Sequence, residues 1–530
     1  MSNSRLTACL LGLLAFLCSF STAQVATSQY DNARTGANLN ETTLTPANVN
    51  AKQFGKVFSF PVDGPIYAQP LYLPAVDVPG KGVHNVAFVA TEHDSVYAFD
   101  ADGKVSEPLW KASFAHPEAG ITAVPARDVD CPFITPEVGI TSTPVIDLQT
   151  GTLYVLARTK ERKGTFSSDE YVQRLHALAI TTGVEKFGGP VVIQASVPGK
   201  GEGSSGGQVK FNPLRDNPRA SLLLSNDRVY VTWASSCDVG PYHGWVMAYD
   251  AHTLAQVGVF NASPDAQESG IWEGDTGPAA DKDGNIFLAT GNGTFDAANN
   301  GRDYGDSVLK LGWKSGKFDL LDYFTPSNQD NLNRKDKDLG SGGVVLLPDQ
   351  PGSQAHVLIV TGKGAVIHVI NRDVMGKFQA DGRNALQELA SAPDEAFGAA
   401  AYWNGHVYYQ FSQDVLKDYS VSNGRLSHDP VARSSTRFVD PGSTPTVSAN
   451  GKRNAIVWVL SSRGWRSADR AAVLYAYDAT NVAHELYNSE QNSARDHAAL
   501  ATRFSIATVV NGRVYVGTRS ELDVYGLLAK

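Results

Sequence analysis

The sequence predicts an all-β fold, an eight-bladed β-propeller whose blades are four-stranded antiparallel sheets. Three observations favour it: many glycines and prolines with few helical patterns, eight similar strand pairs, and a third apolar segment ahead of most pairs. One such sheet cannot bury both of its faces, whereas sheets stacked radially bury them against one another. A repeat architecture of this kind accounts for about 500 residues as a single domain.

Each unit is a strand, a polar turn and a second strand that ends in an Asp/Gly turn, as in NVAFVATEHDSVYAFDADG (residues 85–103). Period-2 alternation with β-branched and aromatic residues favours strands over helices. The second strands begin near Val96, Leu175, Val246, Val308, Val366, Val415, Val473 and Leu522. Residues 55–530 are assigned to the propeller, and GKVFSFPVDG (residues 55–64) is expected to pair with the last unit and close the ring.

The first residues are typical of an export signal. Arg5 precedes an apolar run, residues 8–20, and the small residues Ser21 and Ala23 fit a signal-peptidase site, which assigns residues 1–23 to a signal peptide. Residues 24–54 form a polar N-terminal arm. No later stretch reaches about 18 apolar residues. We therefore expect an exported protein, periplasmic or extracellular, without a membrane span.

Cleavage would leave two cysteines, Cys131 and Cys237. A single disulfide is the simplest expectation in an oxidising compartment, and two buried free thiols are the alternative. The chain has no CxxC or CxxCH, which argues against a zinc ribbon and a covalently attached c-type haem. A formal charge of −9 without a Lys/Arg cluster argues against nucleic-acid binding.

Three units end in AFDADG, AYDAHT and AYDATN. These endings resemble the blade-terminal A-x-D-x-x-x-G of pyrroloquinoline quinone (PQQ) repeats, found in the quinoprotein alcohol dehydrogenase-like superfamily. The entry segment YDNARTGANLNETTLTPANVNAKQFGKVFSF (residues 30–60) is similar to that of the dehydrogenases. The resemblance implies PQQ and calcium as cofactors, an alcohol or sugar as substrate, and a separate electron acceptor.

The segment NIFLATGNGTFDAANNGRDYGDSVLKL (residues 285–311) carries the strongest functional signal. Quinoprotein alcohol dehydrogenases have a strand that ends in TGNG, and its Asn oxygen ligates calcium, a cation that prefers oxygen ligands. The resemblance gives that role to Asn292; an ordinary Asn-Gly turn is the alternative. Glu137, just ahead of a predicted strand, is a second candidate calcium ligand, with a capping or solvent-facing role as its alternative.

Two further segments resemble the catalytic parts of the family. FTPSNQDNLNRKDKDLGSGG (residues 324–343) resembles the segment of the general base, for which Asp338 is preferred and Asp336 is the second candidate. Lys363 stands where the family has a basic residue on a quinone carbonyl oxygen, where a cation stabilises developing negative charge. The alternatives are a solvated charge cluster at residues 334–338 and a lysine in a turn.

The sequence also departs from the family. It lacks the adjacent Cys-Cys pair that covers the cofactor in many members, and it lacks a fused cytochrome domain. A second hypothesis is therefore a non-catalytic exported propeller that binds a protein or glycan partner through its loops. Carboxylates converging with Asn292 beneath a flat slot on the axis would favour the enzyme, and an axis filled by bulky apolar side chains would favour the second hypothesis.

Overall fold

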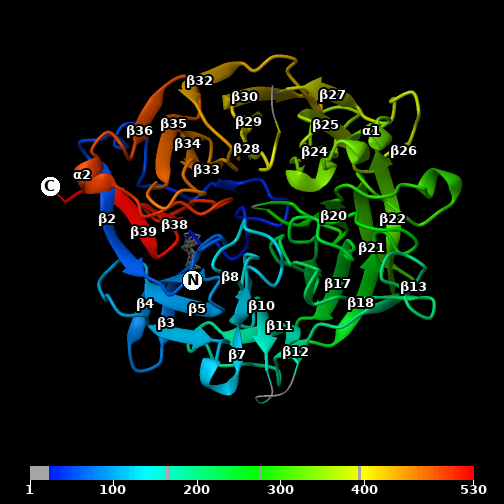
Figure 1. The fold of residues 1–530 in the computed structure, drawn as a ribbon. Coiled ribbons are helices and arrows are strands. Elements are labelled where there is room, and N and C mark those ends of the chain that lie inside the picture. The colour runs from blue at the N-terminus through cyan, green and yellow to red at the C-terminus, as the bar shows by residue number, and fades with distance from the viewer. Residues whose placement is uncertain (1–22, 163, 165–167, 275, 392–394, 530) are drawn as a thin grey trace, which may run out of the picture.

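The computed structural model describes residues 23–162, 164, 168–274, 276–391 and 395–529. These residues are nearly all β and form a ring of eight antiparallel blades (Figure 1). Each predicted second strand lies in the third strand of a blade, so the predicted fold is confirmed. The expected signal peptide, apart from Ala23, lies outside the described residues.

The first strand of each blade lies near the axis and the last lies at the rim (Figure 1). Blades 1 to 4 contain β3 (Leu71–Val78), β4 (Gly82–Ala90), β5 (Ser95–Asp100), β6 (Trp110–Ser113); β9 (Val145–Asp147), β10 (Thr152–Glu161), β11 (Glu170–Ala179), β12 (Val191–Val192); β15 (Leu223–Ser225), β16 (Arg228–Thr232), β17 (Trp245–Asp250), β18 (Gln256–Asn261); and β19 (Ala279–Ala280), β20 (Ile286–Ala289), β21 (Val308–Lys314), β22 (Lys317–Thr325). Blades 5 to 8 contain β23 (Val344–Leu346), β24 (Val357–Val360), β25 (Val366–Asn371), β27 (Gln387–Ala390); β28 (Ala401–Trp403), β29 (His406–Gln410), β30 (Val415–Ser422), β31 (Arg425–Leu426), β32 (Ala432–Arg437); β33 (Thr446–Asn450), β34 (Arg453–Ser461), β35 (Val473–Asp478), β36 (Glu485–Asn488); and β37 (Thr508–Val510), β38 (Arg513–Gly517), β39 (Glu521–Leu527), β2 (Phe54–Pro61).

Shorter elements lie in the arm and in the loops. They are β1 (Ala37–Asn38), β7 (Ile121–Pro125), β8 (Glu137–Val138), β13 (Ser196–Pro198), β14 (Gln208–Lys210), β26 (Lys377–Phe378), α1 (Gln329–Arg334), α2 (Ser493–Asp496) and the 3₁₀ turns η1 (Pro117–Ala119), η2 (Ala297–Asn299) and η3 (Leu339–Ser341). Within the described ranges, no helix has the length and apolar character to cross a bilayer.

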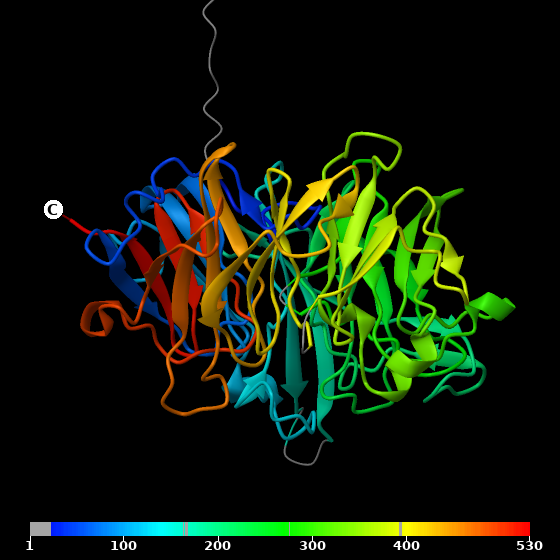
Figure 2. The ribbon, with the colours of Figure 1, turned by 90° about the horizontal axis from the view of Figure 1, so that it is seen from above.

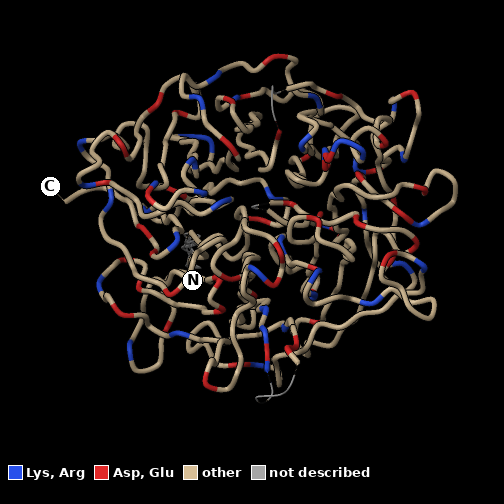
Figure 3. The backbone as a smooth tube through the Cα atoms, viewed as in Figure 1, with Lys and Arg blue, Asp and Glu red and all other residues tan. Residues whose placement is uncertain are grey.

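The core lies between blades, because each blade buries both faces against its neighbours. Leu156 and Leu175 of blade 2, for example, share one buried cluster with Val231 and Trp245 of blade 3. Burial of apolar surface, at about 25 cal/mol per Å², drives this stacking. Acidic and basic residues are interspersed around the ring (Figure 3).

The N-terminal strand closes the ring, as expected. β2 pairs antiparallel with β39, with Phe60 opposite Leu522, and becomes the outer strand of blade 8. The Lys56 ammonium lies 2.5 Å from the buried carboxylate of Asp523 in β39 and 2.9 Å from Glu521. The first and last parts of the chain therefore share one sheet.

The polar arm ahead of β2 crosses one face of the disc (Figures 1 and 2). It hydrogen-bonds to the first strand of all eight blades, through Val25 with Tyr72, Ala26 with Ile146, Asn32 with Leu224 and Ala280, Ala33 with Leu346, Thr35 with Tyr402, Gly36 with Val447, and Tyr30 with Val509. Arg34 is fully buried within this arm. The arm thus closes the propeller axis from one side.

Candidate functional site

The TGNG segment directly follows β20, and its first glycine is required by close packing. A Cβ atom on Gly291 would lie 2.1 Å from Asp338 Oδ1 and 2.8 Å from the Trp272 ring. Both distances are shorter than a van der Waals contact, so no residue with a Cβ atom fits at position 291. Gly291 therefore lets the Asp338 carboxylate approach the backbone of this loop.

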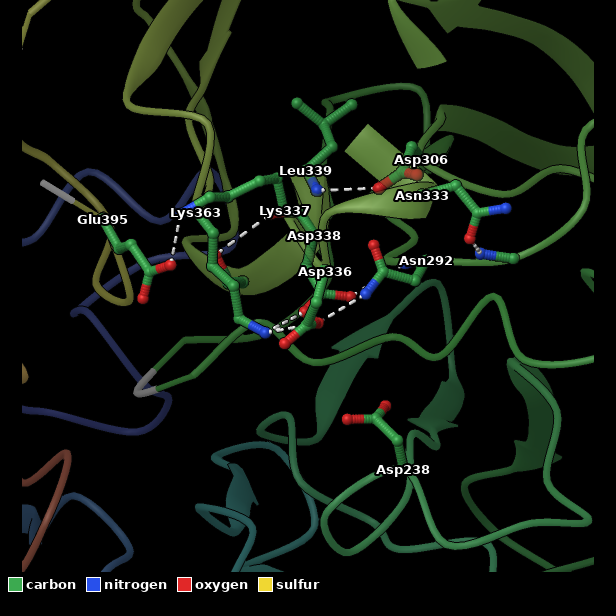
Figure 4. A network of polar contacts seen from close by, with 12 residues as sticks. Asp238, Asn292, Asp306, Asn333, Asp336, Lys337, Asp338, Leu339, Lys363 and Glu395 are labelled. Atoms are coloured by element: carbon green, nitrogen blue, oxygen red, sulfur yellow. Dashed lines mark hydrogen bonds and ion pairs between the residues drawn. The ribbon is translucent and has the colours of Figure 1, made fainter. Parts of the chain in front are cut away.

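Asn292, Asp336, Asp338 and Lys363 meet in one polar network (Figure 4). The Asn292 backbone N–H donates to Asp338 Oδ1 at 2.8 Å, and its side-chain Nδ2 donates to Asp336 Oδ1 at 2.6 Å. Lys363 Nζ lies 2.6 Å from Asp338 Oδ2 and 2.9 Å from Asp336 Oδ1. The structure thus brings together four residues that the sequence spreads over about 70 positions.

The two aspartates differ sharply in environment. The Asp338 side chain is 2% exposed, whereas that of Asp336 is 66% exposed. Burial raises the pKa of Asp338 above its usual value, although the charge of Lys363 opposes this. Burial acts to lower the pKa of Lys363, but the Asp338 carboxylate outweighs it and raises that pKa. Asp338 is thus the better placed of the two for a role that requires a desolvated carboxylate.

Asn292 retains an unused acceptor. Its Oδ1 atom is buried and has no hydrogen-bond partner in the described part of the chain. A buried carbonyl oxygen without a partner costs about 1–3 kcal/mol, so a bound cation or donor at this point would be favourable. The hydrogen bonds donated by the backbone N–H and by Nδ2 of Asn292 fix the orientation of this oxygen.

Asp338 and Lys363 of this network form part of the wall of an axial pocket of about 120 Å³, whereas Asn292 and Asp336 are not among its lining residues. The Cys131–Cys237 disulfide and the ring of Trp272 line the same pocket. Asp238, next to the disulfide, faces the network (Figure 4), and burial followed by the charge of Asp338 raises its pKa to about 6.

A smaller cavity shares Arg219 and Phe504 with this pocket, and the hydroxyl of Thr276 in its wall donates to Gln29 of the arm at 2.7 Å. The arm therefore contacts the wall of this neighbouring cavity.

The predicted disulfide is confirmed, and it joins residues 106 positions apart. Glu137 lies elsewhere: its Oε1 is 2.5 Å from His93 Nδ1, and it is not part of the pocket wall among the described residues. In the described ranges, no group of three or more His, Cys, Asp or Glu side chains is placed to hold a metal ion. Neither Glu137 nor Asn292 is therefore a wall residue of this pocket, and Asn292 is linked to the wall by its hydrogen bond to Asp338.

Several residues that line the pocket are not marked by any motif in the sequence. They are Trp272, Arg219, Arg503, Phe397 and Phe504. Trp272 lies 20 positions ahead of Asn292, within the irregular segment between β18 and β19, and only the folded chain brings its ring to Gly291 of TGNG. The others come from loops of different blades, so their proximity depends on ring closure.

The comparisons with known proteins support the fold. No family model and no curated protein matches the sequence. The solved quinohemoprotein alcohol dehydrogenase ADHIIG from Pseudomonas putida HK5 aligns with 96% of this chain and 81% of its own, at a TM-score of 0.62 and 14% identity. BamB from Moraxella catarrhalis aligns with 89% of this chain and 99% of its own, at a TM-score of 0.46 and 13% identity. The likeness to ADHIIG shows a shared propeller fold.

Glu273, which follows Trp272, gives a prediction for the pH dependence of stability. It is fully buried; Oε1 accepts from Ala289 N–H at 3.0 Å and Oε2 has no partner within the described chain. Burial raises its pKa from 4.5 to about 8. Between these values the unfolded carboxylate is ionised while the folded one keeps its proton, so its contribution to stability falls by up to about 1.4 kcal/mol per pH unit as pH rises.

Glu273→Gln resembles the protonated acid at every pH. We expect it to match the parent protein near pH 4.5 and to be the more stable of the two at pH 8. Urea unfolding of both proteins at pH 5 and pH 8 measures this difference. Equal pH slopes for the two would contradict a buried, protonated Glu273.

Proposed function

We propose that this chain is an exported, quinoprotein-like oxidoreductase that binds a planar quinone of the PQQ type in its axial pocket and oxidises an alcohol or sugar. One observation carries the proposal: Asp338 and Lys363 line a pocket together with the disulfide and Trp272, and Asn292 donates a hydrogen bond to Asp338. The disulfide favours an oxidising compartment. Electrons would pass to a separate acceptor.

The donor set fits such a cofactor. The disulfide and Trp272 offer surfaces for a flat ring. Asn292 Oδ1, which has no hydrogen-bond partner among the described residues, is an acceptor suited to calcium. Asn292 would hold the cation through this oxygen, and the bound quinone would provide further oxygens. Typical cofactor pockets measure roughly 300–1,000 Å³. At about 120 Å³, the walls of this pocket must separate to admit a tricyclic ring.

The residues of the chain have distinct roles in this proposal. When bound, PQQ supplies the two-electron acceptor. Asp338 takes the proton of the substrate hydroxyl at its carboxylate, and Lys363 places positive charge where negative charge develops. Trp272 and the disulfide exclude water from the pocket.

Calorimetric titration of the mature protein with PQQ, with and without calcium, tests the proposal. We expect calcium-dependent binding that Asn292→Ala weakens at least roughly tenfold, because the substitution removes the oriented oxygen. Asn299→Ala is the matched control, since Asn299 is exposed in the same loop. No heat and no change in melting temperature at high PQQ concentration would overturn the proposal.

A second candidate is the non-catalytic propeller that binds a protein or glycan. One observation favours it: Lys363 is already neutralised by Asp336 and Asp338, as in a purely structural ion pair. This candidate would be supported if the protein did not bind PQQ and instead bound a specific partner through the loops of its blades.

A further inference from the structure

The side of the axial pocket formed by blades 7 and 8 and the loop ahead of blade 3 carries a cluster of arginines and aromatic rings. Arg503 Cζ lies over four ring centroids, at 4.3 Å from Phe504, 4.6 Å from Trp465, 4.9 Å from Phe133 and 5.4 Å from Phe397. Arg219 Cζ lies 4.7 Å from the Phe504 ring, and Arg466 Cζ lies 4.5 Å from the Trp465 ring. The rings hold Arg503 in a fixed position.

Arg503 is a buried cation with unused hydrogen-bonding capacity. The residue is 9% exposed, and its Nε atom is buried without a hydrogen-bond partner in the part of the chain that the structure describes. Burial, and then the nearby charge of Arg219, lowers its pKa to about 10, so it remains charged at neutral pH. A buried charge is costly unless it is paired. The geometry favours an external anion at this point.

Two of the rings around Arg503 also line a second cavity. Arg503 lines the axial pocket together with Arg219, and its ring partner Phe133 lines both that pocket and the second cavity, of about 390 Å³. Trp465 and Arg466 line only the second cavity.

The charges of the axial pocket are separated. Asp238 and the Asp338–Lys363 ion pair line one part of its wall, and Arg219 and Arg503 line another. A ligand with a carboxylate at one end and a hydroxyl at the other would match both parts. The carboxylate would accept charge-assisted hydrogen bonds from guanidinium groups, and the hydroxyl would face the acidic part.

We infer that Arg503 is the anchor of a carboxylate-binding subsite, and that the substrate is an acidic alcohol such as a sugar acid or an aromatic hydroxy acid. The carboxylate-binding subsite is inferred from the geometry of the pocket alone. That its ligand is a substrate rests on the proposed function. The carboxylate belongs to the substrate rather than to the quinone.

Calorimetric titrations of the protein without PQQ test the subsite with two acid–neutral pairs. The first is D-glucuronate against D-glucose, and the second is 4-(hydroxymethyl)benzoate against benzyl alcohol. We expect at least one acid to bind roughly tenfold or more tightly than its neutral partner, since charged hydrogen bonds add at least that factor. Equal binding within both pairs, or no binding of either acid at millimolar concentration, would overturn the inference.

Three variants assign the effect to Arg503. Arg503→Gln should remove the preference for the acid, and Arg503→Lys should keep part of it. Arg466→Gln should leave it unchanged, because the exposed Arg466 stacks on the same Trp465 ring but lies outside the axial pocket. Near-ultraviolet circular dichroism confirms that each variant is folded. A preference that survives in folded Arg503→Gln would overturn the role of Arg503.

A PQQ titration of Arg503→Gln separates the two sources of a carboxylate. Unchanged PQQ affinity supports a substrate carboxylate, and a loss of PQQ affinity equal to the loss for the acids would overturn it in favour of the cofactor. If the parent protein binds an acid but no PQQ, the proposed function fails while the subsite stands. The two failures are therefore distinguishable.

Discussion

Asp338→Asn should lower kcat/KM for alcohol oxidation by roughly 10²–10⁴-fold, the usual contribution of a general base, while PQQ binding persists. The substitution keeps the size of the side chain and removes the proton acceptor. In the parent protein, activity should fall as pH drops through the pKa of Asp338, which burial raises above its usual value. Activity falls on the acidic side of the pH profile because only the ionised carboxylate of Asp338 accepts a proton. Dye-linked assays across pH, with PQQ and calcium present, measure both effects.

Asp336→Asn is the matched control for this prediction. Asp336 contacts the same Lys363 ammonium, but its side chain is 66% exposed, so we expect less than a roughly tenfold loss of activity. A larger loss for Asp336→Asn than for Asp338→Asn would reassign the base. Equal losses for both would indicate that the ion-pair network, rather than a proton acceptor, supports the activity.

Arg34→Ala should lower the free energy of unfolding by roughly 3–5 kcal/mol, because it empties a fully buried site and leaves several acceptors without donors. Its guanidinium donates to Thr27 Oγ1 and Ser28 O within the arm, at 2.8 Å each. It also donates to Pro278 O and Leu222 O, at 3.0 and 3.2 Å, between blades 3 and 4. Urea denaturation followed by tryptophan fluorescence measures the loss.

Lys52→Ala provides the comparison, since Lys52 is an exposed residue of the same arm, and we expect a change within about 0.5 kcal/mol. Arg34→Lys should recover only part of the stability, because an ammonium does not reproduce the planar set of donors. If Arg34→Ala and Lys52→Ala had the same free energy of unfolding, the contacts of Arg34 with blades 3 and 4 would not stabilise the propeller.

The local sequence pattern was enough to predict the blades. Strand alternation and Asp/Gly turns act over a few residues, so the third strand of every blade, such as that containing Val96, was placed correctly. The closing strand at residues 55–64 was also predicted, because one unpaired apolar strand remained for the last blade. The disulfide followed from the count of two cysteines remaining after the expected cleavage.

The candidate site was only partly visible in the sequence. Asn292, Asp338 and Lys363 were identified by their order along the chain, and the structure places them in contact. Glu137 had the right residue type, but its loop brings it to His93 instead. Nothing in the sequence around Arg503 indicated a pocket residue.

The sequence by itself determined the strands, their grouping into eight blades and the closure of the ring, because those depend on short-range alternation and on burial between neighbouring sheets. Only the tertiary structure decided what lies on the axis. There Arg34 of the arm binds Pro278, which is 244 positions away, Asn292 of the TGNG loop binds Asp338, and Arg503 lines the same pocket as Asp338. Contacts of this kind depend on the lengths and paths of irregular loops, which obey no local periodicity.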